Sequence, residues 1–214
     1  LGDLDGEVVV TCGDVPLLSG ETLQSLILGH REAGNAVTVL TAQNPNPTGY
    51  GRIVRDAAGE VERIVEQKDA SDDELAITEI NSGIYVFDGR VLADGLARIT
   101  SDNAQAELYL TDVLGIARSD GRRVGTHVVD DLWQTEGVND RVQLARMDAE
   151  INRRICERWM RAGVTIVSPE SVRIDRDVDL AQDVTLLPGT HLQGATTVAS
   201  GATIGPDTTL TDVE

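Results

Sequence analysis

The chain has 214 residues, 41% of them hydrophobic, so it is long enough for one large domain or two smaller ones with a buried core. Its formal net charge of -18 argues against nucleic acid and anionic membranes as partners, because both would be repelled at long range. A substrate that carries phosphate would therefore need local charge compensation, and a divalent cation is the simplest source.

Nothing in the sequence suggests export or a membrane span. No apolar run approaches the roughly 20 residues that cross a bilayer, and the first residues, Leu1 to Asp5, lack the basic and apolar regions of a signal peptide. The two cysteines, Cys12 and Cys156, have no metal-ligand spacing, so we expect free thiols in a reducing cytoplasm.

The first predicted strand covers residues 8–11, where three valines and a threonine follow one another. Such an unbroken apolar run favours a strand that is covered on both faces, as in a parallel α/β sheet. Asp14 then follows the carboxyl end of this strand, the edge at which open α/β sheets bind their ligands. The simpler alternative is that Asp14 shapes the turn before Pro16, since aspartate is a common turn residue.

A helix is predicted next over residues 21–33, with Ser19 as its N-cap and Gly34 as its end. His30, near the end of this helix, is expected to interact with the helix dipole and not to take part in catalysis. Residues 36–42 predict a second buried strand. The order strand, helix, strand predicts a parallel crossover unit.

Two short strands, residues 52–55 and 61–66, are separated by a glycine-containing turn and predict a hairpin. Its second strand ends at Glu66, and an acidic, irregular stretch through Glu74 follows. The next strand, residues 77–87, contains Asn81-Ser82-Gly83, where glycine permits close approach of a ligand or another backbone. Taken singly, Glu66 would be a surface strand end and Asn81 part of a β-bulge.

The remaining part of this region alternates helices and a strand and ends in a long helix. Helices are predicted over residues 91–99 and up to residue 119, and a strand over 124–129. A polar turn at 136–140 opens the longest helix, residues 141–162, which Gly163 ends. Its apolar stripe consists of Leu144, Met147, Ile151 and Ile155. This helix is a plausible connector between domains.

The sequence style then changes to a six-residue repeat. An aliphatic residue recurs at every sixth position, namely Ile174, Leu180, Leu186, Leu192, Val198, Ile204 and Leu210. Two places before each lies a small or β-branched residue: Val172, Val178, Val184, Thr190, Thr196, Ala202 and Thr208. This period is typical of a parallel β-helix, whose aliphatic side chains point inward and stack from coil to coil.

Six short motifs occur in order before the repeat. They are Cys-Gly-Asp-Val-Pro-Leu (12–17), Gly-Tyr-Gly-Arg-Ile (49–53), Val-Glu-Gln-Lys-Asp (65–69), Asn-Ser-Gly-Ile-Tyr (81–85), Asn-Ala-Gln-Ala-Glu-Leu-Tyr-Leu-Thr-Asp (103–112) and Glu-Gly-Val-Asn (136–139). Together with the repeat, they closely resemble the bacterial bifunctional N-acetylglucosamine-1-phosphate uridylyltransferase/glucosamine-1-phosphate N-acetyltransferase family. The resemblance covers essentially the whole chain.

The resemblance implies a partial Rossmann-like nucleotide-diphospho-sugar transferase domain of the α/β class over residues 1–140. A connecting helix over 141–163 and the first coils of a left-handed β-helix acetyltransferase domain over 164–214 would follow. The family joins UTP to N-acetylglucosamine 1-phosphate and makes UDP-N-acetylglucosamine for the cell wall. Its β-helix forms a homotrimer and acetylates glucosamine 1-phosphate from acetyl-CoA.

Residue by residue, the resemblance implies that Asp14 and Asn139 are ligands of Mg2+. Cys12 and Gly13 would line the nucleotide-sugar pocket. Three further residues, Gly51, Glu66 and Asn81, would hold the sugar. Mg2+ commonly takes one or two oxygen ligands from the protein, while phosphates and water supply the others, so one carboxylate and one amide suffice.

The resemblance also implies that the family's catalytic residues lie outside this sequence. The glycine-rich loop with its catalytic Arg and Lys would precede Leu1, and the acetyltransferase residues would follow Glu214, so Lys68 is not assigned a catalytic role. We expect the 214-residue polypeptide alone to make no UDP-N-acetylglucosamine. Two alternatives stay open: another sugar-1-phosphate nucleotidylyltransferase with a β-helix tail, and a non-catalytic assembly subunit.

Overall fold

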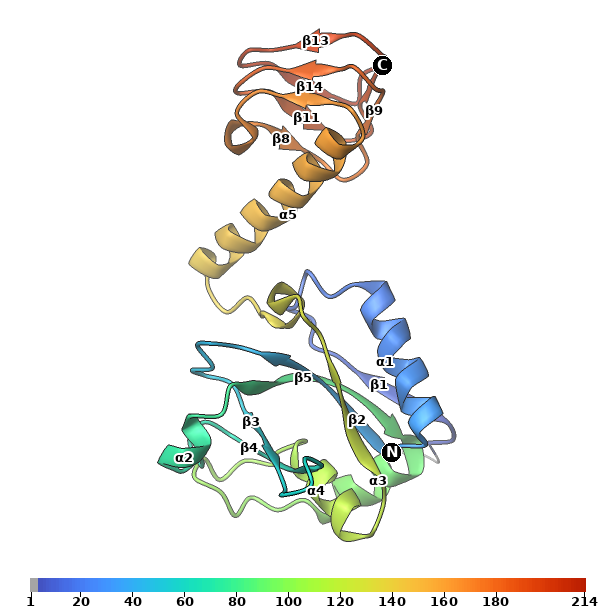
Figure 1. Ribbon diagram of the computed structural model, residues 1–214, viewed down its shortest axis with the longest axis vertical. Helices are drawn as coiled ribbons and strands as arrows, with labels where there is room; N and C mark the ends of the chain where they lie inside the picture. The colour runs from blue at the N-terminus through green and yellow to red at the C-terminus, as the bar shows by residue number, and fades with distance from the viewer. Residues whose placement is uncertain (1–3) are drawn as a thin grey trace. The chain divides into compact units, whose positions relative to one another are not determined.

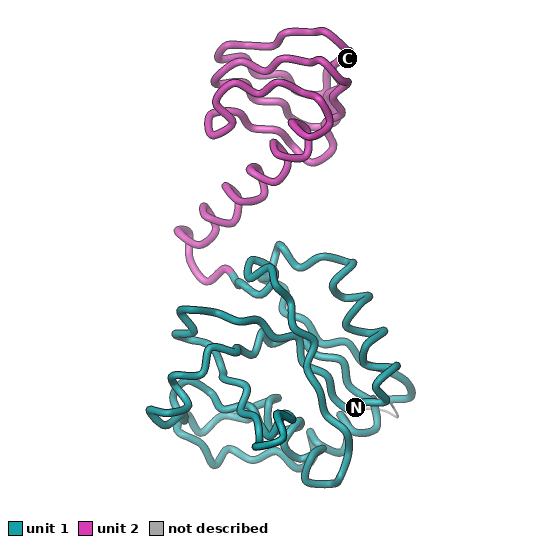
Figure 2. The backbone as a smooth tube through the Cα atoms, viewed as in Figure 1, with its two compact units in different colours: residues 1–137 teal, residues 138–214 magenta. Residues whose placement is uncertain are grey.

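The computed structural model describes residues 4–214. The chain forms two compact units, the first ending at Gly137 and the second beginning at Val138 (Figure 2). Each unit has its own hydrophobic core.

The first unit is built on a mixed six-stranded sheet in which the order is β4-β3-β5-β2-β6 and β1 also pairs with β5 (Figure 1). The strands are β1 (Glu7–Val10), β2 (Val37–Gln43), β3 (Arg52–Arg55), β4 (Val61–Val65), β5 (Glu79–Asp88) and β6 (Val124–Val128). The helical segments are α1 (Gly20–Ala33), α2 (Asp72–Leu75), α3 (Gly89–Arg98), α4 (Asp112–Ser119) and the 3-10 helix η1 (Leu132–Thr135). The predicted strands and longer helices are therefore present, with ends that differ by a few residues.

The first strand differs from its prediction. Among the described strands, β1 pairs antiparallel with β5 alone, and its four residues alternate between exposed and half-buried. The expectation of a strand covered on both faces of a parallel sheet is wrong, because β1 lies at an edge of a mixed sheet where apolar residues are only partly covered. β1 and β2 both run antiparallel to β5, so they point in the same direction, as the predicted crossover requires.

One edge of β5 is shared between two strands, which leaves an interruption in the sheet. β1 pairs with residues 85–88 of β5, whereas β3 pairs with it at Ile80. Between Ile80 and Tyr85, no strand within residues 4–214 pairs with this edge, although the Gly51 carbonyl accepts a hydrogen bond from Asn81 N at 2.9 Å. The carboxyl end of β1 and the start of β3 flank this interruption, which we call the β1/β3 break.

The sheet separates two hydrophobic clusters because successive strand residues face opposite sides. Val39, Tyr85 and Phe87 belong to the cluster that includes Leu92 of α3 and Val113 of α4. Leu40, Ile84 and Val86 pack with Leu26 of α1 instead. Helices therefore cover both faces, as the α/β class predicts.

Two local predictions in this unit are corrected. His30 is 3% exposed, and its Nδ1 lies 2.9 Å from Thr38 Oγ1. Burial lowers the His30 pKa, which disfavours the charged form that a helix dipole would stabilise, so His30 is a packed and hydrogen-bonded core residue. The acidic stretch through Glu74 was predicted to be irregular, but it contains helix α2. A capping box between Ser71 and Glu74 stabilises the start of this helix.

The second unit consists of α5 (Arg141–Arg161), the 3-10 helix η2 (Pro169–Ser171) and short parallel strands. The strands are β7 (Thr165–Ile166), β8 (Arg173–Ile174), β9 (Asp179–Leu180), β10 (Thr185–Leu186), β11 (His191–Gln193), β12 (Thr197–Val198), β13 (Thr203–Ile204) and β14 (Thr209–Thr211). They form three parallel sheets, β7-β10-β13, β8-β11-β14 and β9-β12. Leu192 pairs with Ile174 and Leu210, each 18 residues away, so three hexapeptides make one coil.

The repeat positions face the interior of this stack. Ile174, Leu180, Leu186, Leu192 and Val198 are all buried, and Ile204 and Leu210 pack against the same core. α5 contributes Cys156 to that core. The predicted stripe of α5 is correct for Met147, which is 2% exposed, but wrong for Leu144, which is 55% exposed and contributes to no buried cluster among the described residues.

Candidate functional site

The predicted nucleotide-sugar residues of the first unit lie at the β1/β3 break. Cys12, two residues after the end of β1, places its Sγ 3.9 Å from the carbonyl oxygen of Gly83 in β5. A Cβ on Gly83 would lie 3.2 Å from this sulfur. The Cys12 thiol and the middle of β5 are therefore in contact, and Gly13 and Asp14 follow on the exposed side.

Asp14 lies beside the turn that ends the first unit. A Cβ on Gly137 would be 3.1 Å from Asp14 Oδ2, so the missing side chain leaves this carboxylate oxygen uncovered. Partial desolvation and the nearby Asp14 carboxylate raise the pKa of the Cys12 thiol. Asp14 is exposed and lies in a turn with Gly13 past the carboxyl end of β1, so its place agrees with the turn-residue alternative, and its role in a ligand site stays a prediction.

The three predicted sugar residues come together from three different segments. A Cβ on Gly51 would lie 3.3 Å from Glu66 Oε2 and 3.4 Å from Asn81 Cβ. Gly51 is buried, whereas Glu66 and Asn81 are half-buried. A side chain at position 51 would therefore press on both polar groups, which gives a steric reason for glycine there.

Glu66 is a carboxylate in an unfavourable position for charge. Burial raises its pKa, and the neighbouring carboxylates of Asp69 and Asp112 act in the same direction. The Thr111 hydroxyl opposes the increase in the Glu66 pKa, although this buried hydroxyl has no hydrogen-bond partner of good geometry among the described residues. A ligand that donates hydrogen bonds to Glu66 would stabilise its charged form.

Tyr85 also belongs to this cluster, although no sequence pattern pointed to it. Its hydroxyl donates to Asn81 Oδ1 at 2.8 Å, and the same oxygen accepts from Gly83 N at 3.0 Å. The Asn-Ser-Gly-Ile-Tyr motif holds all three residues, but the bond between Tyr85 and Asn81 forms where the register of β5 against β2 shifts and Gly83 is left-handed, with φ of +78°. Strand alternation alone cannot predict that contact.

A buried arginine supports the loop before β3. Arg52 is 2% exposed, and its guanidinium donates to the Tyr50 carbonyl and, at 2.9 Å, to Gln67 Oε1. The same Gln67 oxygen accepts from Gly49 N at 3.1 Å. Burial lowers the Arg52 pKa. This network links the loop that contains Gly51 to the residue that follows Glu66.

Asn139 belongs to the second unit, two residues beyond Gly137. It is exposed, and its backbone N–H donates to Gln143 Oε1 at 2.6 Å. Asp140, the next residue, is the N-cap of α5 and forms a capping box with Gln143. The role of Asn139 as a second metal ligand stays a prediction.

The donor set tests whether Mg2+ fits this chain. The structure describes no group of three or more His, Cys, Asp or Glu side chains over residues 4–214 that could hold a metal ion. Mg2+ needs no such group, since it binds through one or two protein oxygens and takes substrate phosphates and water for the others. The exposed Asp14 carboxylate, uncovered at Gly137, fits that requirement.

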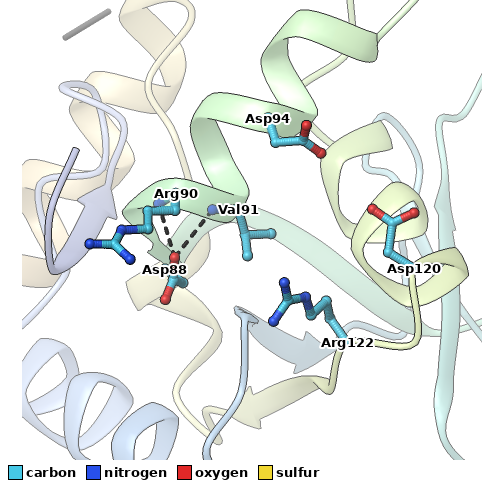
Figure 3. A pocket seen from close by; sticks show the side chains of 6 residues that line it. All are labelled: Asp88, Arg90, Val91, Asp94, Asp120 and Arg122. Carbon is cyan, nitrogen blue, oxygen red and sulfur yellow. Dashed lines mark hydrogen bonds between the residues drawn. The ribbon is translucent and has the colours of Figure 1, made fainter. Parts of the chain in front are cut away.

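A separate pocket of about 300 Å³ is lined by Asp88, Arg90, Val91, Asp94, Asp120 and Arg122 (Figure 3). Asp88 pairs with Glu7 at the start of β1, so this pocket lies at the opposite end of the strand from Asp14. The Asp88 carboxylate caps α3 by accepting from Arg90 N and Val91 N. Asp94 and Asp120 form ion pairs with Arg98. These charges have structural partners, so we do not assign a site here.

Residues 1–148 match the protein family described as Nucleotidyl transferase, and the chain belongs to this family. Its curated relatives include proteins named Bifunctional protein GlmU. The one from Cutibacterium acnes is 60% identical over 220 residues, covering 100% of this chain and 52% of that protein. The one from Paenarthrobacter aurescens is 59% identical over 211 residues, which cover 99% of this chain and 42% of that protein. The chain thus spans about half the length of the relatives it matches, and the predicted resemblance is confirmed.

A solved structure supports the fold. The putative glucose-1-phosphate thymidylyltransferase from Bacillus anthracis, in complex with sucrose, matches with a TM-score of 0.50 and 20% identity, over 67% of this chain and 54% of that chain. No helix described over residues 4–214 is long and apolar enough to cross a membrane.

Proposed function

We propose that this chain contributes to uridylyl transfer from UTP to N-acetylglucosamine 1-phosphate, which yields UDP-N-acetylglucosamine for the cell wall. The observation that carries the proposal is the convergence of Cys12, Gly51, Glu66 and Asn81 at the β1/β3 break, next to Asp14. Membership of the nucleotidyl transferase family and the names of its close relatives support the same reaction class.

In this proposal, Asp14 and Asn139 hold Mg2+, which when bound offsets the charge of the phosphates in an otherwise acidic protein. Cys12 and Gly13 line the pocket, and the absence of a side chain at Gly13 leaves room beside the backbone. Glu66 accepts hydrogen bonds from sugar hydroxyl groups, and Asn81 binds a second polar group of the sugar. Gly51 lets the backbone approach the ligand closely.

The second unit is proposed to be the beginning of a left-handed β-helix. Its three parallel sheets and its coil of 18 residues support this architecture. In the complete protein, further coils would bind acetyl-CoA and acetylate glucosamine 1-phosphate, and the β-helix would form a homotrimer in the cytoplasm. Both proposals rest on the resemblance to the bifunctional relatives.

The decisive assay uses the complete reading frame that contains this chain. Pyrophosphate release from UTP and N-acetylglucosamine 1-phosphate is expected, and it should exceed release with glucose 1-phosphate. A preference for glucose 1-phosphate would favour the other sugar nucleotidylyltransferases. A folded protein that binds the ligands without releasing pyrophosphate would favour the non-catalytic subunit.

Asp14→Asn tests the metal assignment in the same protein. The variant keeps the side-chain size but removes the negative charge, so we expect Mg2+-dependent binding of UDP-N-acetylglucosamine to fall at least tenfold in calorimetric titration. Asp5→Asn is the matched control, because Asp5 is exposed and pairs with Arg90 at 2.7 Å, away from the break. Equal binding by wild type and Asp14→Asn would remove Asp14 from the site.

A further inference from the structure

The phenol of Tyr85 is a buried polar group whose partner belongs to the candidate sugar site. Tyr85 is 2% exposed and stacks on Phe87, with ring centroids 5.3 Å apart. Its hydroxyl donates to Asn81 Oδ1 at 2.8 Å. Phenylalanine would fill the same core volume, so the hydroxyl is explained by its bond to Asn81 and not by packing.

The two bonds at Asn81 also fix which end of its carboxamide is free. A backbone N–H can only donate, so the side-chain atom 3.0 Å from Gly83 N must be the amide oxygen. The Tyr85 hydroxyl donates to this same oxygen, and together the two donors occupy both of its lone pairs. The NH2 group, for which the described residues provide no hydrogen-bond acceptor, is the part that remains for a ligand.

We propose that Tyr85 is a positioning residue that holds the Asn81 carboxamide with its NH2 group free for the sugar. The position therefore selects a ligand with a hydrogen-bond acceptor, such as a carbonyl or hydroxyl oxygen, at this point. This inference rests on the proposed function, since it assumes that a sugar phosphate occupies the β1/β3 break.

The residues around Asn81 determine what its orientation means for a bound sugar. Gly51 lies against the Asn81 Cβ, and a Cβ on Gly51 would also lie 3.3 Å from Glu66 Oε2, so the Glu66 carboxylate is close to Asn81. Burial is the largest cause of the raised pKa of Tyr85, and the Glu66 carboxylate acts in the same direction. The phenol therefore stays protonated and can donate its hydrogen bond. Glu66 can only accept when ionised and the oriented Asn81 can only donate, so the two side chains distinguish donor from acceptor groups on the sugar.

The test is Tyr85→Phe in the complete reading frame, assayed by pyrophosphate release. Loss of one hydrogen bond that orients a ligand-binding group is expected to raise KM for N-acetylglucosamine 1-phosphate by roughly 2- to 12-fold, with kcat changed less than about twofold. In an Asn81→Ala background, Tyr85→Phe is expected to have no further effect on KM. Phe87→Leu is the matched control, because it loosens the same aromatic stack without contacting Asn81, and its KM should match that of the wild type.

Two kinetic results would overturn the inference: an unchanged KM in Tyr85→Phe, or an equal rise in KM with and without Asn81. The side-chain amide resonance of Asn81 provides a readout that does not depend on activity, and it is expected to shift in Tyr85→Phe but not in Phe87→Leu. A wild-type enzyme that releases no pyrophosphate would instead contradict the proposed function. An unshifted amide resonance would contradict the role of Tyr85 even then.

Discussion

At the scale of single residues, the candidate site depends on glycines that let polar side chains approach one another. Gly83 has φ of +78° and touches Cys12, while Gly51 separates Glu66 from Asn81. A left-handed backbone is disfavoured for residues that carry a Cβ, and a buried glycine leaves no space for one. A side chain at Gly51 or Gly83 would therefore disturb the polar groups beside it.

Gly83→Ala is expected to lower the free energy of unfolding by about 1–2 kcal/mol, because the left-handed conformation becomes strained. Its Cβ would also lie 3.2 Å from Cys12 Sγ. Gly13→Ala is the matched control, since Gly13 lies in the same region, has no positive φ, and has nothing within 4 Å of the position that a Cβ would take. Urea denaturation of both variants measures the difference, and equal midpoints would contradict the proposed strain at Gly83.

Glu66→Gln tests the electrostatics of the site. Because folding raises the pKa of Glu66, its carboxyl stabilises the fold at pH values below the unfolded pKa, and this contribution is lost as pH rises through the folded pKa. The neutral variant should therefore gain stability relative to wild type as pH rises from 4 to 7. Denaturant titrations across this range measure it, and a pH-independent difference would contradict the raised pKa.

At the scale of elements, the caps and ion pairs of α5 explain how a long polar helix starts and stays ordered. Asp140 and Gln143 form a capping box at its beginning. Further along, Glu150 is 7% exposed and accepts from Arg153 and Arg154. These hydrogen bonds lower the pKa of Glu150 to about 2, although its burial opposes the change.

Glu150→Gln is expected to destabilise the protein by about 1–3 kcal/mol at pH 7, because two arginines lose their charged acceptor. Folding lowers the pKa of Glu150, so its carboxylate stabilises the fold at pH values above the unfolded pKa of about 4.5. This stabilisation is lost as the pH falls toward the folded pKa of about 2. The variant and wild type should therefore converge as pH falls from 7 to 3, opposite to Glu66→Gln. Glu157→Gln is the control: Glu157 pairs with Arg161 and Arg153 at the surface, so losing its charge should change stability little.

At the scale of the whole molecule, the two units are stabilised in different ways. The first relies on helices that cover both faces of one sheet. The second stacks coils, so each inward side chain contacts the coils before and after it. A residue in the middle of the stack therefore loses more on truncation than one in the last described coil.

Leu192→Ala is expected to lower the free energy of unfolding by about 2–5 kcal/mol, since Leu192 is fully buried between two coils. Leu210→Ala, in the same sheet but only partly buried, should cost less than half as much. Each unit contains one of the two tryptophans, Trp133 and Trp159, so Trp133→Phe leaves a fluorescence signal from the second unit alone. Equal losses for the two leucines would contradict the stacked-coil explanation.

Strong local signals were sufficient to predict several helices and strands. Ser19 and Gly34 predicted the ends of α1, and the hexapeptide period predicted every strand from β8 to β14. These succeed because caps and repeats act through neighbouring residues or a fixed spacing. The resemblance of the six motifs to a known family also predicted that Cys12, Gly51, Glu66 and Asn81 belong to one site.

Which strands are neighbours and which side chains meet depends on contacts between distant parts of the chain. The valines of β1 predicted a buried strand, yet β5 is its single partner among the described strands, and pairing between distant strands is not encoded in a local pattern. His30 was expected to interact with the helix dipole, yet it is buried and its ring bonds to Thr38 of the next strand. Tyr85 bonds to Asn81 where the register of β5 against β2 shifts and Gly83 takes a left-handed conformation, and no spacing rule anticipates that bond.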